Sequence, residues 1–138
     1  MMLLKSLLLS CLISLSFACM CSAPDMYRLY CLSKFVLHIK VKDYEFADSD
    51  IQYIIQPLKV YKNEPNLPMS NLTKIETDPT SCSISLIPTV EYLIITNSLR
   101  NGNLYLTACD YHTSWYSLTR NERKTLRKNT DCTPFVSR

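Results

Sequence analysis

Cysteine is the residue type in this sequence with the most chemistry to offer. The chain has 138 residues and seven cysteines, a density typical of small exported proteins whose cysteines form disulfide bonds. Thiolates also bind soft metal ions, and the Cys19-Met20-Cys21 spacing would suit a metal clip. Because structural disulfides persist in an oxidising compartment, the choice between these interpretations depends on whether the chain is exported.

The first residues of the chain predict export. One positive charge, Lys5, precedes an apolar run over residues 7–17, and small residues stand at Ser16 and Ala18. This is the pattern of a secretory signal peptide that is cut after Ala18, and the apolar run is too short to span a bilayer comfortably. We therefore expect a secreted, extracellular protein without a membrane span.

The predicted cut divides the chain into a signal peptide, residues 1–18, and one domain, residues 19–138. A bacterial lipoprotein cut before Cys19 is the less favoured alternative, because Ser16 stands where such proteins usually have a branched apolar residue. An even number of cysteines remains in the mature chain, which favours disulfides over a metal clip and leaves 15 pairings open by arithmetic alone. These cysteines are Cys19, Cys21, Cys31, Cys82, Cys109 and Cys132.

No enzyme motif stands out in the sequence. The chain has two histidines, and no zinc-protease, phosphate-loop or serine-hydrolase motif occurs. His38 falls on the polar side of a predicted strand, where we expect an exposed residue without a role. Asp110, His112 and Ser114 could be grouped as a hydrolytic triad, but three neighbours on a short loop cannot converge as a triad requires. We expect a protein that is not an enzyme and has no cofactor of its own.

The charge of the chain gives no argument for nucleic-acid binding, because a net charge of +3 is too mild. Positive residues gather in one predicted helix near the C-terminus. They could make a weak contact with heparin-like polyanions, but Glu122 interrupts the positive run and a solvated helix face is the simpler interpretation. The residues concerned are Arg120, Arg123, Lys124, Arg127 and Lys128.

Alternating apolar residues predict a mainly β fold. Pro57 lies within one apolar stretch and implies a bulge or an edge position there. The Asn101-Gly102 pair predicts a hairpin turn between a strand at residues 91–96 and one at residues 103–108, with the single glycine of the chain where a positive φ is needed. Strands are expected at residues 35–41, 51–61, 91–96 and 103–108, with shorter ones at 72–77 and 83–86.

Helices are expected only near the two ends of the mature chain, at residues 24–32 and 119–128. Thr119 and Glu122 have the spacing of a capping box that would open the second helix. Asn71 begins an Asn-Leu-Thr sequon, which predicts a surface position able to carry an N-linked glycan. The pattern predicts a monomeric, closed Greek-key barrel of five or six strands, similar to an OB fold, with short terminal helices and three disulfides.

The cysteine spacing and the intervening segments resemble one known family. The Cys19-x-Cys21 opening followed by Cys31, residues 55–62, and residues 91–126 are similar to the inhibitory N-terminal domain of the tissue inhibitors of metalloproteinases, within the netrin-like superfamily. The resemblance covers nearly the whole mature chain. It implies the disulfide pairs Cys19 to Cys82, Cys21 to Cys109 and Cys31 to Cys132.

This resemblance implies a secreted inhibitor of zinc metalloendopeptidases such as the matrix metalloproteinases. The α-amine and carbonyl oxygen of Cys19 would chelate the zinc ion of the target protease and displace its water. Met20 would enter the S1′ pocket, and Thr80 and Ser81 would fill neighbouring unprimed subsites. The alternative is a non-inhibitory netrin-like module that binds a receptor, a matrix component or a host protein. The expected protease contacts are Cys19, Met20, Cys21, Ser22, Thr80, Ser81 and Cys82.

Three features depart from the family pattern. Met20 is larger than the Thr or Ser usual after the first cysteine, so we expect a selectivity that favours deep S1′ pockets. Residues 25–28 stand where the family usually has a His-Pro-Gln stretch, and Ser83 stands where it commonly has a glycine.

Overall fold

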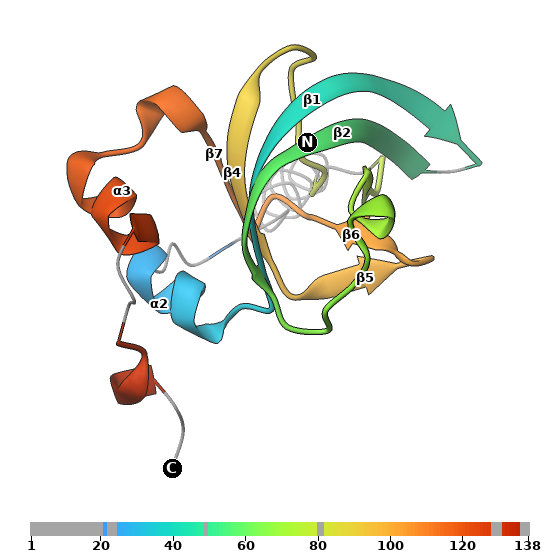
Figure 1. The fold of residues 1–138 in the computed structure, drawn as a ribbon. Helices are drawn as coiled ribbons and strands as arrows, with labels where there is room; N and C mark the ends of the chain where they lie inside the picture. Colours follow the sequence, from blue (N-terminus) through green and yellow to red (C-terminus); the bar gives the residue numbers. More distant parts are fainter. Residues whose placement is uncertain (1–20, 22–24, 49, 80–81, 128–130, 136–138) are drawn as a thin grey trace, which may run out of the picture.

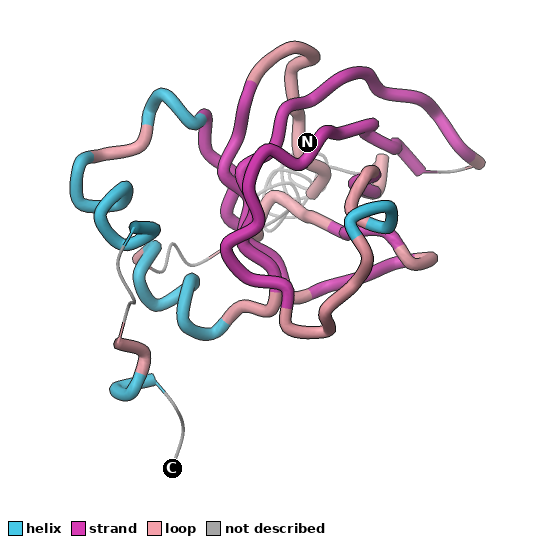
Figure 2. The backbone as a smooth tube through the Cα atoms, in the orientation of Figure 1, coloured by secondary structure: helices cyan, strands magenta, loops and turns pink. Residues whose placement is uncertain are grey.

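The fold is built on one curved sheet with helices on one flank. The computed structural model describes residues 21, 25–48, 50–79, 82–127 and 131–135. In this part of the chain the strands follow the order β5-β6-β3-β2-β1-β4-β7 in a seven-stranded mixed sheet. Figure 1 shows helices α2 and α3 side by side on the flank of β4 and β7, with the β5–β6 hairpin on the opposite flank. Apart from η2, the helical turns gather on that first flank (Figure 2).

The elements are short apart from the first two strands. Among the described residues, the α-helices are α2 (Met26–Leu32) and α3 (Arg120–Arg127), and the 3-10 turns are η2 (Met69–Asn71), η3 (Trp115–Ser117) and η4 (Thr133–Phe135). The strands are β1 (Phe35–Ala47), β2 (Asp50–Asn63), β3 (Lys74–Thr77), β4 (Glu91–Thr96), β5 (Ser98–Arg100), β6 (Asn103–Tyr105) and β7 (Tyr111–Ser114).

Strand β1 lies inside the sheet, between β2 on one side and β4 on the other, and both pairings are antiparallel. Its alternating apolar residues Phe35, Leu37, Ile39 and Val41 are fully buried, as the period-2 pattern predicts. The register with β2 shifts where Ile39 faces Pro57. The bulge expected from this proline is therefore confirmed, and it helps the long hairpin to curve.

The expected closed barrel is wrong. In the described chain the hydrogen-bonded order ends in β5 and β7, and no ladder joins these two strands. They have only three and four residues. Closure requires edge strands long enough to pair with the stagger that a barrel imposes, and strands of this length offer few bonds for it. Over the residues that the structure describes, the sheet curves but stays open, and it has seven strands rather than five or six.

The Asn-Gly turn forms where it was predicted, but it joins different strands. Asn101 and Gly102 both have positive φ, 52° and 78°, and the turn connects β5 to β6. The strand over residues 91–96 pairs instead with β1 and β7. It ends at Thr96, and the side-chain oxygen of the next residue, Asn97, accepts a hydrogen bond from the Lys34 amide at 2.8 Å.

The strand expected at residues 83–86 does not form, because a side chain holds this segment. The Tyr53 hydroxyl donates to the carbonyl of Ile84 at 3.3 Å and accepts from the amide of Leu86 at 3.2 Å. Ile84 and Leu86 are both buried in the main core cluster. The segment therefore packs against the main core as a loop and not as a further strand.

Both expected helices are present within a turn of their predicted limits. The Glu122 side chain accepts from the Thr119 amide at 2.7 Å, and the Glu122 amide donates to the Thr119 hydroxyl at 3.2 Å, so the capping box is confirmed. Helix α2 begins after Asp25, whose carboxylate accepts from the Arg28 amide. None of the helices in the described ranges has the length and hydrophobicity of a transmembrane span.

The helices cover the second face of the sheet. They form a smaller core cluster with residues whose side chains leave β1 and β4 on the side opposite the main core. Its buried members are Met26, Val36, Leu93, Ile95, Leu118 and Leu126. A disulfide between Cys31 and Cys132, with the two Cα atoms 5.3 Å apart, ties α2 to the C-terminal segment as predicted.

Gly102 provides a test of the β5–β6 turn. A Cβ atom added at this glycine would meet no atom within 4 Å, so the cost of a larger residue comes from its positive φ alone. We expect Gly102→Ala to lower the free energy of unfolding by about 1 kcal/mol. Gly102→Asn should cost less, because asparagine tolerates this region better. Urea unfolding measures both, and an alanine variant as stable as the wild type would contradict the turn geometry.

Candidate functional site

Three segments that are far apart in the sequence meet at one place, which we call the disulfide platform: Cys21, Cys82 and residues 107–110. A disulfide joins Cys21 to Cys109, with the two Cα atoms 5.1 Å apart. The amide of Ala108 donates to the carbonyl of Cys82 at 2.8 Å. Cys82 is itself disulfide-bonded. One cystine bridge, between Cys21 and Cys109, and one backbone hydrogen bond, between Ala108 and Cys82, therefore hold the three segments together.

The turn that carries Cys109 is held by its own side chains. The carboxylate of Asp110 accepts from the amide of Thr107 at 2.8 Å and from its hydroxyl at 3.3 Å. The amide of Asp110 in turn donates to the Thr107 carbonyl at 3.0 Å. Closed turns of this kind restrict the backbone, so the half-cystine at Cys109 gives Cys21 a well-fixed partner.

The chain is also anchored on both sides of residues 80–81. On one side, the Tyr105 hydroxyl donates to Asp78 at 2.6 Å, and Arg100 donates to the other oxygen of the same carboxylate. On the other side, the Ile84 amide donates to the hydroxyl of Thr77 at 3.2 Å. Sequence reasoning missed this anchor, because nothing in the spacing of Asp78, Arg100 and Tyr105 indicates that they meet.

The contacts that anchor Asp78 shift the pKa values of the groups that make them. The hydrogen bond from Tyr105, followed by the one from Arg100, lowers the pKa of Asp78 below its ordinary value. The same contact raises the pKa of Tyr105, because the hydroxyl must keep its proton to donate. The carboxylate is therefore ionised in the folded protein over the neutral range.

The platform contains the two expected contact residues that fall in the described part of the chain, Cys21 and Cys82. Of the three implied disulfides, the pairs of Cys21 with Cys109 and Cys31 with Cys132 are confirmed. The pair of Cys19 with Cys82 has one member outside the described residues. The other expected contacts, Met20, Ser22, Thr80 and Ser81, also lie outside them, and their roles remain predictions.

His38 is not the exposed residue that the sequence predicts. Its side chain is 13% exposed and its ring stacks on Trp115, with the ring centroids 3.7 Å apart and the planes 7° from parallel. Its Nε2 atom lies 2.9 Å from a carboxylate oxygen of Glu91. Burial lowers the pKa of His38, and the bond to Glu91 offsets this only in part. His38 therefore packs η3 against the sheet.

The neighbours Asp110, His112 and Ser114 do not form a triad. His112 places its Nδ1 atom 2.9 Å from the backbone carbonyl of Asp110, while the Asp110 carboxylate is engaged with Thr107. No group of three or more His, Cys, Asp or Glu side chains in the described residues could hold a metal ion. Asn71 is exposed on η2, as its sequon predicts.

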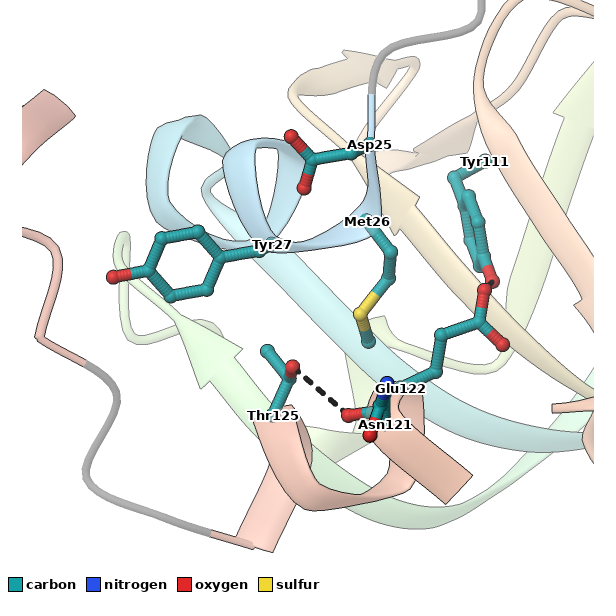
Figure 3. Close-up of a pocket in the computed structure, with 7 residues that line it drawn as sticks. All are labelled: Asp25, Met26, Tyr27, Tyr111, Asn121, Glu122 and Thr125. Carbon is teal, nitrogen blue, oxygen red and sulfur yellow. Dashed lines mark hydrogen bonds between the residues drawn. The ribbon is translucent and has the colours of Figure 1, made fainter. Parts of the chain in front are cut away.

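A pocket of about 360 Å³ lies between α2 and α3 and is lined by none of the platform residues (Figure 3). Met26 points into it, with Tyr27 and Tyr111 on opposite sides. Its carboxylates already serve as helix caps: Glu122 also accepts from the Tyr111 hydroxyl at 3.3 Å. This pocket is therefore a junction between the helices. It is lined by Asp25, Met26, Tyr27, Tyr111, Asn121, Glu122 and Thr125.

Comparison with known proteins gives a consistent result. Residues 17–134 match the family described as "Tissue inhibitor of metalloproteinase". The chain is 30% identical over 134 residues to metalloproteinase inhibitor 2 of Bos taurus, covering 87% of this chain and 59% of that protein. It is 30% identical over 122 residues to the rabbit protein of the same name (Oryctolagus cuniculus), covering 78% and 61%. For the human protein the identity is 29% over 134 residues, covering 87% and 59%.

Protonation of Asp78 should weaken the anchor. The unfolded carboxyl titrates near 3.8, so the stabilisation is complete above that pH and is lost as the pH falls toward the lower folded value. Asp78→Asn should therefore destabilise the protein most at about pH 6, and its deficit relative to the wild type should shrink by about pH 3. Urea unfolding at several pH values measures this deficit.

Two tyrosine variants control this experiment. Tyr105→Phe removes the hydrogen bond that contributes most to the lowered pKa of Asp78. The stability that this variant loses relative to the wild type should therefore also be smaller at about pH 3 than at about pH 6. Tyr44→Phe alters an exposed hydroxyl that forms no hydrogen bond with Asp78, and its small effect should not change with pH. A deficit of Asp78→Asn that stays constant from neutral to acid pH would contradict the anchor.

Proposed function

Because the chain belongs to the tissue inhibitor of metalloproteinase family, whose members inhibit proteases and are not enzymes, we propose that it inhibits zinc metalloendopeptidases through the disulfide platform. The observation that carries the proposal is the convergence of Cys21, Cys82 and the turn at Cys109 on one rigid support. The chain spans about 60% of the length of the curated relatives it matches. Its target proteases are therefore part of the proposal.

The inhibitory group in this proposal is the amino terminus produced by cleavage after Ala18. The α-amine and the carbonyl oxygen of Cys19 would form a five-membered chelate with the zinc ion of the protease, in the position that a catalytic zinc keeps for water. The amine must be neutral to bind, and an α-amine with a pKa of about 7.7–8 loses its proton at modest cost near neutral pH.

Rigidity is what the platform contributes to this mechanism. Two residues from Cys19, the disulfide of Cys21 fixes the chain against Cys109, and a disulfide from Cys19 to Cys82 would fix it a second time. A segment ordered before docking loses little conformational entropy on binding, so more of the contact energy appears as affinity. The anchor at Asp78 supports the same argument for Thr80 and Ser81, which would lie beside Cys19 in the unprimed subsites.

Secretion is a further part of the proposal. The cystines at Cys21–Cys109 and Cys31–Cys132 are consistent with a secreted protein. The apolar stretch at residues 7–17 would direct export, and its removal would free the amine of Cys19. Export would therefore depend on the presence of this segment, and inhibition on its removal.

A single added residue tests the chelate. We expect a mature protein extended by one alanine before Cys19 to lose inhibition of matrix metalloproteinases, because the new terminal amine can no longer form the five-membered ring with the Cys19 carbonyl. Its urea unfolding should match that of the unextended protein. An alanine added after Arg138 is the matched control and should leave inhibition intact. Equal potency of the two extended proteins would refute the chelate.

Met20 tests the placement of the segment in the cleft. Burying a methionine side chain in S1′ is worth about 1.5–3 kcal/mol, so Met20→Gly should raise the inhibition constant about 10- to 150-fold. Met20→Leu keeps the apolar volume and should change it little. Met69→Ala, at a methionine that is 53% exposed on η2, serves as control. If Met20→Gly inhibits as well as the wild type, Met20 does not enter the pocket.

One assay distinguishes the proposed inhibitor from the alternative function, a non-inhibitory binding module. The purified protein is first shown by mass spectrometry to begin at Cys19 with an unmodified amine. A panel of matrix metalloproteinases is then assayed with the protein at micromolar concentration. If no enzyme is slowed, the inhibitor proposal fails and the binding module stands.

A further inference from the structure

A second pocket, of about 220 Å³, opens between β2 and α3 and shares no residue with the disulfide platform. Three of its lining side chains are positively charged, two are aromatic, one is aliphatic and none is acidic. Such a lining suits an anionic group, because the cations bind its charge and the aromatic rings hold two of these cations, Lys59 over Tyr61 and Arg123 over Trp115. The lining residues are Lys59, Tyr61, Trp115, Arg123, Leu126 and Arg127.

The positive charges of this pocket are not neutralised by the protein. Among the described residues, no carboxylate lies within ion-pair distance of Lys59, Arg123 or Arg127. Arg127 and Arg123 also lie close enough to the hydroxyl of Tyr61 to oppose the rise in its pKa that burial causes. The cations therefore converge on a shared space and leave it positive.

One of the cations is already positioned for binding. The guanidinium of Arg123 donates to the carbonyl of Trp115 at 2.6 Å and lies over its ring, 5.0 Å from the centroid. The ring of Trp115 is held in turn by its stacking on His38. An arginine fixed in this way loses little entropy when it binds an oxyanion through its remaining donors.

Glu122 does not weaken the basic surface, contrary to what the sequence predicts. Its carboxylate accepts from the amide of Thr119 and the hydroxyl of Tyr111, on the side of α3 that faces α2. It lines the other pocket and not this one. The interruption seen in the sequence is therefore absent from the surface that carries Arg123 and Arg127.

The positive charge continues along α3 beyond the pocket. Arg120, Lys124 and Arg127 are exposed and follow one another at spacings of four and three residues, which places them on one helix face over about 10 Å. A single bound anion would use only the pocket, whereas this row suits a chain of regularly spaced anionic groups. Sulfated polysaccharides have this chemistry, with sugar rings and one or more charges on each unit.

We propose that this face binds a sulfated polysaccharide, with one sulfate in the pocket between Arg123, Arg127 and Lys59 and the following sugars along α3. The proposal does not depend on protease inhibition. It uses none of the residues of the disulfide platform, so either property could fail without the other.

Trp115 provides the test, because it is the only tryptophan in the chain and it lines the pocket. A heparin-type oligosaccharide titrated into the full mature protein should change the tryptophan fluorescence saturably. Arg127→Ala and Lys59→Ala should each weaken binding about tenfold, as expected for loss of one charge-assisted contact. Each should also reduce the slope of log affinity against log salt by about one. Lys42→Ala, at an exposed lysine outside the pocket, should change neither quantity.

The chemistry of the probe separates sulfate recognition from general attraction to negative charge. The same oligosaccharide with its sulfates removed but its carboxylates retained should bind at least tenfold more weakly. The proposal is overturned if both forms bind equally, or if Lys42→Ala weakens binding as much as Arg127→Ala. It is also overturned if a sulfotyrosine peptide saturates the fluorescence change and the oligosaccharide causes none.

Discussion

The disulfide between Cys21 and Cys109 is the constraint on which the proposed function depends. It joins residues 88 apart in the sequence, and in the chain-entropy model a closed loop of this size stabilises the fold by about 4–5 kcal/mol. Its local effect matters more here. It holds Cys21 against the turn whose amide at Ala108 is bonded to Cys82, and so brings one residue from each of the two expected contact segments to one support.

The two faces of the sheet pack against different parts of the molecule, and β1 contributes side chains to both faces. Phe35 and its alternate neighbours fill the main core together with Leu106, which directly precedes the platform turn that begins at Thr107. Val36 belongs to the core beneath the helices, and His38 stacks on Trp115 on the same face. One strand thus connects the support of the proposed inhibitory segment with the basic surface of α3. The two surfaces are separate in residues but share one scaffold.

Local patterns predicted the local structure well. The alternation at residues 35–41, the Asn101-Gly102 turn and the capping box at Thr119 each act through neighbours in the sequence, and each is found. Closure of the sheet and the path after Thr96 were predicted wrongly, because they depend on long-range contacts such as the one between Lys34 and Asn97. For the same reason, the spacing of residues 83–86 could not indicate that the Tyr53 hydroxyl holds this segment as a loop.

The site was predictable only as far as the family resemblance reached. Cysteine spacing alone left every pairing open, and the resemblance identified the two pairs that the described residues contain. The anchor of Asp78 by Tyr105 and Arg100 and the stack of His38 on Trp115 carry no sequence signal. In each case the partners come from different strands and turns, and only the folded chain brings them together.

Direct observation of the metal ion tests the central claim most closely. A matrix metalloproteinase in which cobalt(II) replaces zinc has a visible spectrum that reports the ligands of the metal. On addition of the mature protein, replacement of the bound water by an amine and a carbonyl should change this spectrum in proportion to inhibitor bound, up to one equivalent. A protease that is fully inhibited while its cobalt spectrum stays unchanged would show that the metal is not chelated, and the account would be wrong.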